Sequence, residues 1–143
     1  MKRCFFALLI VLSISFQSAP AATQDEEVRF ATAARKVLDT HDADALAALT
    51  CWDRVPDKLK ENGKKQYARD AARAVIDVRL TNPDPKFPDL VWKDKDGTAY
   101  RSNLAVTKQL NITFASGGLF KEVTYPIGEK DGKLYLLEPA PVK

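Results

Sequence analysis

A single histidine lies beside two carboxylates near the start of the chain. His41 is followed by Asp42 and Asp44, and an imidazole beside a carboxylate is a common arrangement for general acid–base catalysis. Adjacent side chains at the start of a helix usually point apart, however. An exposed loop between two helices is therefore the simpler interpretation of His41, and catalysis is the alternative.

Cysteine and histidine are too scarce to build a zinc site. The chain has two cysteines, Cys4 and Cys51, and one histidine, whereas structural zinc is held by four such ligands. Cys51 has apolar neighbours and no adjacent His or Lys that would stabilise a thiolate. We expect a buried thiol, with a reactive thiol or an intermolecular disulfide as the alternatives. No metal and no cofactor is predicted.

One acidic loop has a superficial likeness to a calcium site. Asp94-Lys95-Asp96-Gly97 begins like an EF-hand loop, but the further ligands and the bidentate Glu are missing at the required spacing. Strand-like residues flank the segment on both sides. We therefore predict a hairpin turn in which Gly97 adopts a positive φ.

Residues 1–21 have the three parts of a secretory signal peptide. Met1–Arg3 is basic, Cys4–Phe16 is apolar, and Ala19 and Ala21 are small residues at the positions read by a signal peptidase. The apolar run is shorter than the roughly 20 residues needed to span a bilayer. We predict cleavage after Ala21, export to the periplasm or the medium, and no stable membrane insertion afterwards. An uncleaved anchor is the alternative.

The predicted mature chain, residues 22–143, has the length of one domain. Loss of Lys2 and Arg3 lowers the formal net charge from +3 to +1, which gives no electrostatic reason to expect nucleic acid as a partner. Loss of Cys4 leaves Cys51 as the one cysteine, so no internal disulfide can form. The domain is long enough to fold by packing alone.

Three helices are expected in the first half of that domain. Thr23 and Glu26 have the spacing of a capping box for an amphipathic helix over 24–39. Asp42 can cap a short second helix, and Pro56 suits the first turn of a third that extends into the low 70s. Inward positions are Leu46 and Leu49 of the second helix and Tyr67, Ala71 and Ala74 of the third, whereas Lys64, Lys65, Arg69 and Arg73 are expected to face water; Gly63 weakens the third helix and could split it.

The remainder of the chain has the pattern of an antiparallel sheet. Residues 75–81 combine β-branched residues with strand alternation, and the Pro-rich segment 82–85 ends that strand. In 104–114 the even positions are apolar apart from Lys108, and the odd positions are mainly polar. Further strands are expected at 90–93, 98–101, 119–127 and 133–138, with turns at 116–118 and 128–132. Helices followed by hairpin strands indicate the α+β class.

Two segments together resemble a known superfamily. Asp42–Leu49 (DADALAAL) resembles the early helix of nuclear-transport-factor-2-like (NTF2-like, cystatin-like roll) domains, and Tyr125–Leu136 (YPIGEKDGKLYL) resembles the closing hairpin of small exported bacterial proteins of that type. The resemblance extends over most of residues 24–139. It implies N-terminal helices packed on a curved antiparallel sheet that forms a cone. Members of this superfamily include enzymes, ligand binders and scaffolds, so the fold alone selects no function.

Enzymes of the resembled superfamily place carboxylates, tyrosines or a histidine in the cavity. The resemblance makes Trp52, Tyr67 and Tyr125 candidates for the pocket, and Asp53, His41, Tyr67 and Tyr125 candidates for catalysis. Inward aromatic residues are usually core residues, and Asp53 can simply cap a turn. A buried Asp53 without a partner would have a raised pKa.

The expected function is therefore binding without catalysis. The apolar fold favours a small apolar ligand or a protein partner, and the sequence offers no convergent set of titratable groups. The alternative is a cavity enzyme of isomerase, dehydratase or hydrolase type that uses an Asp/His/Tyr set. A structural role as a homodimer is the third possibility.

Overall fold

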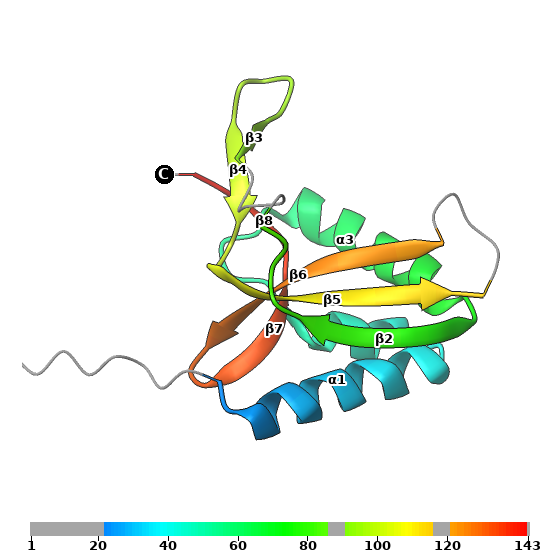
Figure 1. The fold of residues 1–143 in the computed structure, drawn as a ribbon. Coiled ribbons are helices and arrows are strands. Elements are labelled where there is room, and N and C mark those ends of the chain that lie inside the picture. The colour runs from blue at the N-terminus through cyan, green and yellow to red at the C-terminus, as the bar shows by residue number, and fades with distance from the viewer. Residues whose placement is uncertain (1–21, 86–90, 116–120, 143) are drawn as a thin grey trace, which may run out of the picture.

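The computed structural model describes residues 22–85, 91–115 and 121–142. Within these ranges the chain is α+β, as predicted, with helices packed on a five-stranded sheet and a small three-stranded sheet beside it (Figure 1). The elements in chain order are α1 (Gln24–Asp39), α2 (Ala43–Ala48), β1 (Thr50–Cys51), α3 (Asp57–Ala71), β2 (Val75–Thr81), β3 (Trp92–Lys93), β4 (Ala99–Ser102), β5 (Val106–Phe114), β6 (Glu122–Lys130), β7 (Lys133–Leu137) and β8 (Pro139–Pro141).

The larger sheet has the strand order β1-β7-β6-β5-β2 and is mixed. The β2–β5, β5–β6 and β6–β7 pairs are antiparallel, whereas β1 pairs with β7 in parallel through Thr50 and Leu136. The expectation of a purely antiparallel sheet is therefore wrong at this edge. The chain that leaves α2 runs in the direction of β7, and the backbone N–H of Leu136 donates to the Leu49 carbonyl at 2.9 Å.

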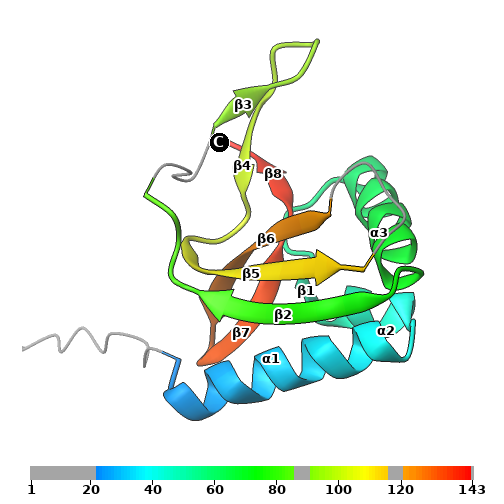
Figure 2. The ribbon, with the colours of Figure 1, turned by 45° about the vertical axis from the view of Figure 1, so that its right-hand side comes forward.

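The smaller sheet has the order β3-β4-β8 and was not foreseen as a separate unit. Strand β8 begins two residues after β7 ends, so Glu138 is the point where the chain passes from one sheet to the other. Figure 2 shows β3 and β4 extending away from the larger sheet. The predicted strand 133–138 corresponds to β7, and β8, in the smaller sheet, was not predicted.

Helix α1 begins where the sequence predicts but is capped by half of the expected box. Thr23 Oγ1 accepts the backbone N–H of Glu26 at 3.3 Å. The Glu26 carboxylate instead accepts hydrogen bonds from Arg29 and from the backbone N–H of Leu134, the latter at 3.1 Å. Burial opposes the charged form of Glu26, but these hydrogen bonds and the Lys133 charge outweigh it, so its pKa is lowered. Glu26 therefore fastens α1 to β7.

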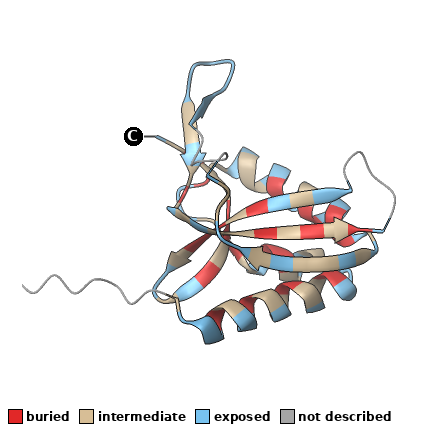
Figure 3. Cartoon of the chain, in the orientation of Figure 1, coloured by how far each residue is buried: buried red, intermediate tan, exposed pale blue. Residues whose placement is uncertain are grey.

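The core lies between the helices and one face of the larger sheet, where buried positions alternate along the strands (Figure 3). The predicted apolar face of β5 is confirmed at Leu110, Ile112 and Phe114. On the opposite face Asn111 Nδ2 donates to Thr81 Oγ1 at 2.9 Å. The other core side chains come from α1, α2, α3, β6 and β7: Phe30, Ala34, Leu38, Leu46, Ala47, Tyr67, Tyr125, Ile127, Leu134 and Leu136.

Ile76 is 55% exposed, at the point where the β2–β5 register shifts between Val75 and Asp77. Two residues depart from the inward and outward positions predicted for them. Ala74 is exposed because α3 ends at Ala71. The Arg73 guanidinium, expected in water, lies 3.7 Å from the centroid of the Phe114 ring.

Lys108, the one charge on the apolar face of β5, is paired at the edge of the core. Its Nζ lies 2.9 Å from Glu27 Oε1 and donates to Asn82 Oδ1 at 3.0 Å. Its long aliphatic chain can cover apolar surface while the ammonium reaches these two acceptors. The charge therefore links α1 to the segment that follows β2.

The two described hairpin turns differ in how well they were predicted. Asp94 Oδ1 accepts the backbone N–H groups of Asp96 and Thr98 at 3.0 and 2.9 Å, and Gly97 has φ +81°. This geometry confirms the turn expected at Asp94–Gly97. The turn expected at 128–132 is tighter than predicted, because β6 continues to Lys130 and only Asp131-Gly132 turn, with φ of 53° and 73°.

Several predictions fall outside the described residues. These are the signal peptide over 1–21, the turn at 116–118, the first residue of the strand expected at 90–93, and the first two residues of the strand expected at 119–127. Among the residues that are described, no helix has the length and hydropathy to cross a bilayer.

Candidate functional site

A groove of about 460 Å³ lies between α3 and the strands β6 to β8. Helix α3 contributes Leu59, Gly63 and Gln66 to the lining, and β6 contributes Tyr125. The segment that passes between the two sheets contributes Leu137 and Glu138, and Trp92 is supplied by β3. Most of this lining is apolar, so the few polar groups define what the groove can recognise.

Glu138 is held in the groove through one of its two oxygens. The Tyr67 hydroxyl donates to Glu138 Oε1 at 2.6 Å and accepts a hydrogen bond from Thr50 Oγ1 at 3.1 Å. No described residue forms a hydrogen bond or ion pair with Glu138 Oε2. Burial raises the pKa of Glu138, and the hydrogen bond from Tyr67 only partly opposes that shift.

Two features of the backbone position the Glu138 carboxyl. A Cβ at Gly63 would lie 2.9 Å from Glu138 Oε1, so a side chain on α3 at this point would force the carboxyl to move. Buried Asn103 fixes the main chain, because its backbone N–H donates to the Glu138 carbonyl at 3.0 Å and its Oδ1 accepts the Glu138 N–H at 3.3 Å. Asn103 Nδ2 also donates to the Cys51 carbonyl at 2.7 Å.

A second tyrosine–carboxylate pair lies next to the first. The Tyr125 hydroxyl donates to Asp70 Oδ2, and Gln66 Nε2 donates to the same oxygen at 2.8 Å. Arg73 Nη1 lies 3.6 Å from the other carboxylate oxygen of Asp70. Asp70 is only 2% exposed. Both of its oxygens are therefore occupied by side chains of the protein.

The three pocket candidates form one aromatic cluster. The ring centroids of Tyr67 and Tyr125 are 5.6 Å apart, and those of Trp52 and Tyr67 are 6.1 Å apart. Tyr67 is fully buried and Tyr125 is the member that lines the groove. Burial and the adjacent carboxylates raise the pKa of both tyrosines. Their hydroxyls consequently remain protonated donors near neutral pH.

The other two catalytic candidates lie at the surface. Asp53 is exposed and pairs with Lys130, whose hydrogen bond and charge hold the pKa of Asp53 below its usual value. His41 is exposed at φ 56°, and its Nδ1 contacts the Ala71 carbonyl oxygen. Neither side chain forms a hydrogen bond with Tyr67 or Tyr125. The structure therefore does not assemble the Asp/His/Tyr set.

Sequence reasoning missed Asp70 and Glu138, the carboxylates that accompany the two tyrosines. Asp70 had a usable signal, since it follows Tyr67 by three residues and precedes Ala71 on the inward side of α3. Glu138 had none, because its position depends on the passage of the chain between two sheets.

The cysteine and metal predictions concern residues that the structure describes. Cys51 is 6% exposed, which confirms the buried thiol. Within 22–85, 91–115 and 121–142, no three His, Cys, Asp or Glu side chains gather closely enough to hold a metal ion.

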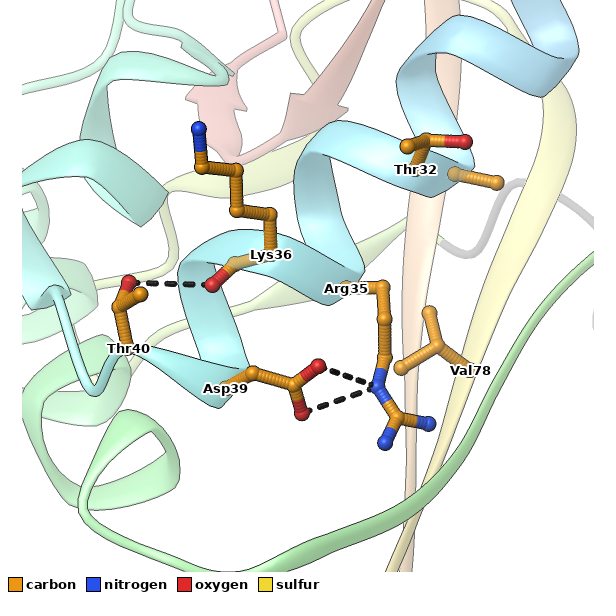
Figure 4. A pocket seen from close by; sticks show the side chains of 7 residues that line it. Thr32, Arg35, Lys36, Asp39, Thr40 and Val78 are labelled. Carbon is orange, nitrogen blue, oxygen red and sulfur yellow. Dashed lines mark hydrogen bonds and ion pairs between the residues drawn. The ribbon is translucent and has the colours of Figure 1, made fainter.

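A second groove, of about 490 Å³, lies between α1 and β2 (Figure 4). Arg35 Nε donates to both carboxylate oxygens of Asp39, at 2.9 and 2.8 Å. Arg35 Nη1 donates to the Ile76 carbonyl oxygen of β2 at 3.1 Å, and Thr40 Oγ1 donates to the Lys36 carbonyl at 3.0 Å. The polar groups here bond to one another at the surface, so this groove is the weaker candidate.

Comparison of the chain with protein families, curated proteins and solved structures found no match. The groove between α3 and β6–β8 is therefore interpreted from its own geometry.

Proposed function

We propose that this protein is an exported, non-enzymatic domain that binds a small, mainly apolar ligand in the groove lined by α3, β6 and Glu138. One observation carries the proposal: a groove of about 460 Å³ with apolar walls contains a carboxylate oxygen, Glu138 Oε2, without a partner among the described residues. Small-molecule sites typically combine apolar walls with a few fixed polar groups.

The protonation of the neighbouring groups favours binding over catalysis. Tyr67 and Tyr125 have raised pKa values and do not act as bases near neutral pH. Both Asp70 oxygens are already bonded within the protein. General acid–base chemistry needs a group that can exchange a proton with the substrate, and only Glu138 meets that condition in the groove.

An acid–base enzyme is the second candidate, on account of Glu138. A carboxyl with a raised pKa in a cleft is a common feature of active sites. The surface positions of Asp53 and His41 remove two members of the expected catalytic set. Isomerase, dehydratase or hydrolase activity would therefore depend on Glu138 without their help.

The fold family and the location are parts of the same proposal. The order of helices before hairpin strands supports an NTF2-like cone, and residues 1–21 support export. Cleavage after Ala21 would convert the Ala22 backbone nitrogen, which donates to Glu129 Oε2 at 2.7 Å, into an ammonium facing a carboxylate. The intact mass of the protein recovered outside the cytoplasm tests this, and an uncleaved mass would contradict it.

Binding is tested by calorimetry and thermal shift on the protein recovered after expression of the full chain. We expect small aryl and alkyl probes such as phenethyl alcohol to raise Tm, by more for probes of higher affinity. Leu59→Gln places an amide on the apolar wall and should weaken binding. Lys64→Gln, at an exposed position of the same helix, is the matched control. Absence of binding by every apolar probe would overturn the proposal.

A further inference from the structure

Glu138 provides an acceptor in the groove that the protein leaves available. Its Oε1 accepts the Tyr67 hydroxyl at 2.6 Å, and its Oε2 has no hydrogen bond to any residue in the described ranges. The carboxyl packs against Gly63, where a Cβ would lie 2.9 Å from Oε1 and 3.3 Å from Oε2. Because Glu138 itself lines the groove, a ligand in the groove can approach Oε2.

The charge of Glu138 is also uncompensated within the described part of the chain. No lysine, arginine or histidine there lies within ion-pair distance of its carboxylate. Arg69 is the cation in the groove lining, and its Nη2 donates to Gln66 Oε1 at 2.6 Å. A half-buried carboxylate without a cation is costly, and a cationic ligand would offset that cost.

Aromatic side chains beside the carboxylate suit the same kind of ligand. Tyr125 and Trp92 line the groove, and Trp92 stacks on Tyr100 with ring centroids 6.0 Å apart. Ammonium groups are attracted to the faces of aromatic rings, and this attraction strengthens when the cation is desolvated. The apolar side chains Leu59 and Leu137 provide contact for a hydrocarbon body.

We propose that the ligand is a small amine with an apolar body, whose ammonium donates to Glu138 Oε2 while the body lies along Leu59 and Leu137. This inference rests on the proposed binding function of the groove and adds the chemical class of the ligand. Tyr67 then has a positioning role, because its hydroxyl holds the carboxyl in place without touching the ligand.

Three probes with the same phenyl body and different heads test the inference by titration calorimetry: phenethylamine, phenethyl alcohol and phenylpropionate. We expect the amine to bind roughly tenfold more tightly than the alcohol, since hydrogen bonds to charged groups are the stronger ones. Phenylpropionate should bind least tightly. Glu138→Gln should remove the preference for the amine, and Glu122→Gln, at an exposed position of β6, should preserve it.

The pH dependence of wild-type affinity gives a second readout that needs no variant. The titratable groups near Glu138 are Tyr67 of α3, which donates a hydrogen bond to it, and Tyr125 of β6, and Arg69 lines the same groove. Amine affinity should rise with pH as Glu138 ionises, and this rise should come at a higher pH than is usual for a Glu because burial raises the pKa of Glu138. At still higher pH the affinity should fall again, when the amine loses its proton. The affinity of the alcohol should lack the rise caused by ion pairing.

The outcomes separate the inference from the function on which it rests. If all three probes bind equally, or if Glu138→Gln keeps the amine preference, the amine assignment is wrong while binding in the groove stands. Preference for phenylpropionate would make Arg69 the recognition group and would also overturn the assignment. Failure of every probe to bind would overturn the proposed function itself.

Discussion

The two tyrosine–carboxylate pairs of the core have the same chemistry in different surroundings. One carboxylate oxygen of Asp70 accepts hydrogen bonds from Tyr125 and Gln66, and Arg73 lies beside the other oxygen. Glu138 accepts a hydrogen bond from Tyr67 on one oxygen, and the residue lines the groove. A carboxylate whose two oxygens both have partners within the protein stabilises the fold, whereas one with a free oxygen can also bind a ligand.

The difference has its origin in the backbone. Asp70 lies within α3, where Gln66 and Arg73 are neighbours at four and three residues and reach it along the same helix. Glu138 lies between two strands of different sheets and has no such local neighbours. Among the described residues, the one hydrogen-bond partner of its carboxylate is Tyr67 of α3. The distinction between the two pairs therefore predicts which substitutions alter stability and which alter binding.

The largest effect is expected from Asp70→Ala. It removes the acceptor of Tyr125 and Gln66 and the ion-pair partner of Arg73, and breaking a buried pair costs about 3 kcal/mol or more. Urea denaturation measures the free energy of unfolding. Glu138→Ala should cost less than half as much, and an equal cost would contradict the contrast between the two carboxylates.

The tyrosines should rank in the opposite order to their carboxylates. Tyr67→Phe removes the one donor to the Glu138 carboxylate among the described residues and the acceptor of Thr50, and we expect a loss of about 2 kcal/mol in unfolding free energy. Tyr125→Phe leaves Asp70 its hydrogen bond from Gln66 and its ion pair with Arg73, and it should lower the unfolding free energy by about 1 kcal/mol. The same denaturation assay decides, and a larger loss for Tyr125→Phe would reverse the comparison.

A smaller effect is expected in the pH dependence of stability. Because burial raises the folded-state pKa of Glu138 above 4.5, stability should fall as pH increases from about 4.5 through the folded pKa. Glu138→Gln should abolish that fall. Glu26 has a lowered pKa, so its contribution is present above about 4.5 and is lost as pH falls through its folded pKa. Thermal melts measured on both sides of pH 4.5 should show that the Glu138 contribution to stability falls with increasing pH and that the Glu26 contribution rises.

The smallest change in stability, with a clear change in binding, is expected for Gly63→Ala. The gain in helix propensity is about 1 kcal/mol, but the new Cβ would lie 2.9 Å from Glu138 Oε1 and displace the carboxyl. The two effects should nearly cancel in unfolding free energy, while affinity for phenethylamine falls. Lys64→Ala, at the next and exposed position, should leave affinity unchanged. Unchanged affinity in Gly63→Ala would mean that the carboxyl is not held there.

The parts of the fold that the sequence predicts are those with local signals. Helix α1 follows from Thr23 and the helical period, and the buried face of β5 follows from the alternation of apolar and polar residues. The parallel β1–β7 pair rests on two residue pairs far apart in sequence, which no local pattern specifies. The outward turn of Ile76 depends likewise on a register shift between β2 and β5.

The candidate site was predictable to a similar extent. Tyr67 and Tyr125 lie on inward faces that periodicity identifies, and the structure brings their rings together. Their carboxylate partners were missed because acidic residues are usually exposed, and burial of Asp70 and Glu138 depends on tertiary partners. Asp53 and His41 stood out by residue type alone, and tertiary structure leaves both at the surface.

The hydrogen bond from Arg35 to the Ile76 carbonyl has a consequence for aggregation. Strand β2 is an outer strand of the larger sheet, and an open strand edge can recruit a strand from another molecule. Arg35, braced by Asp39, occupies a carbonyl of β2 beside exposed Ile76 and places a charge there. Helix α1 thus hinders the addition of a foreign strand at this point of the β2 edge.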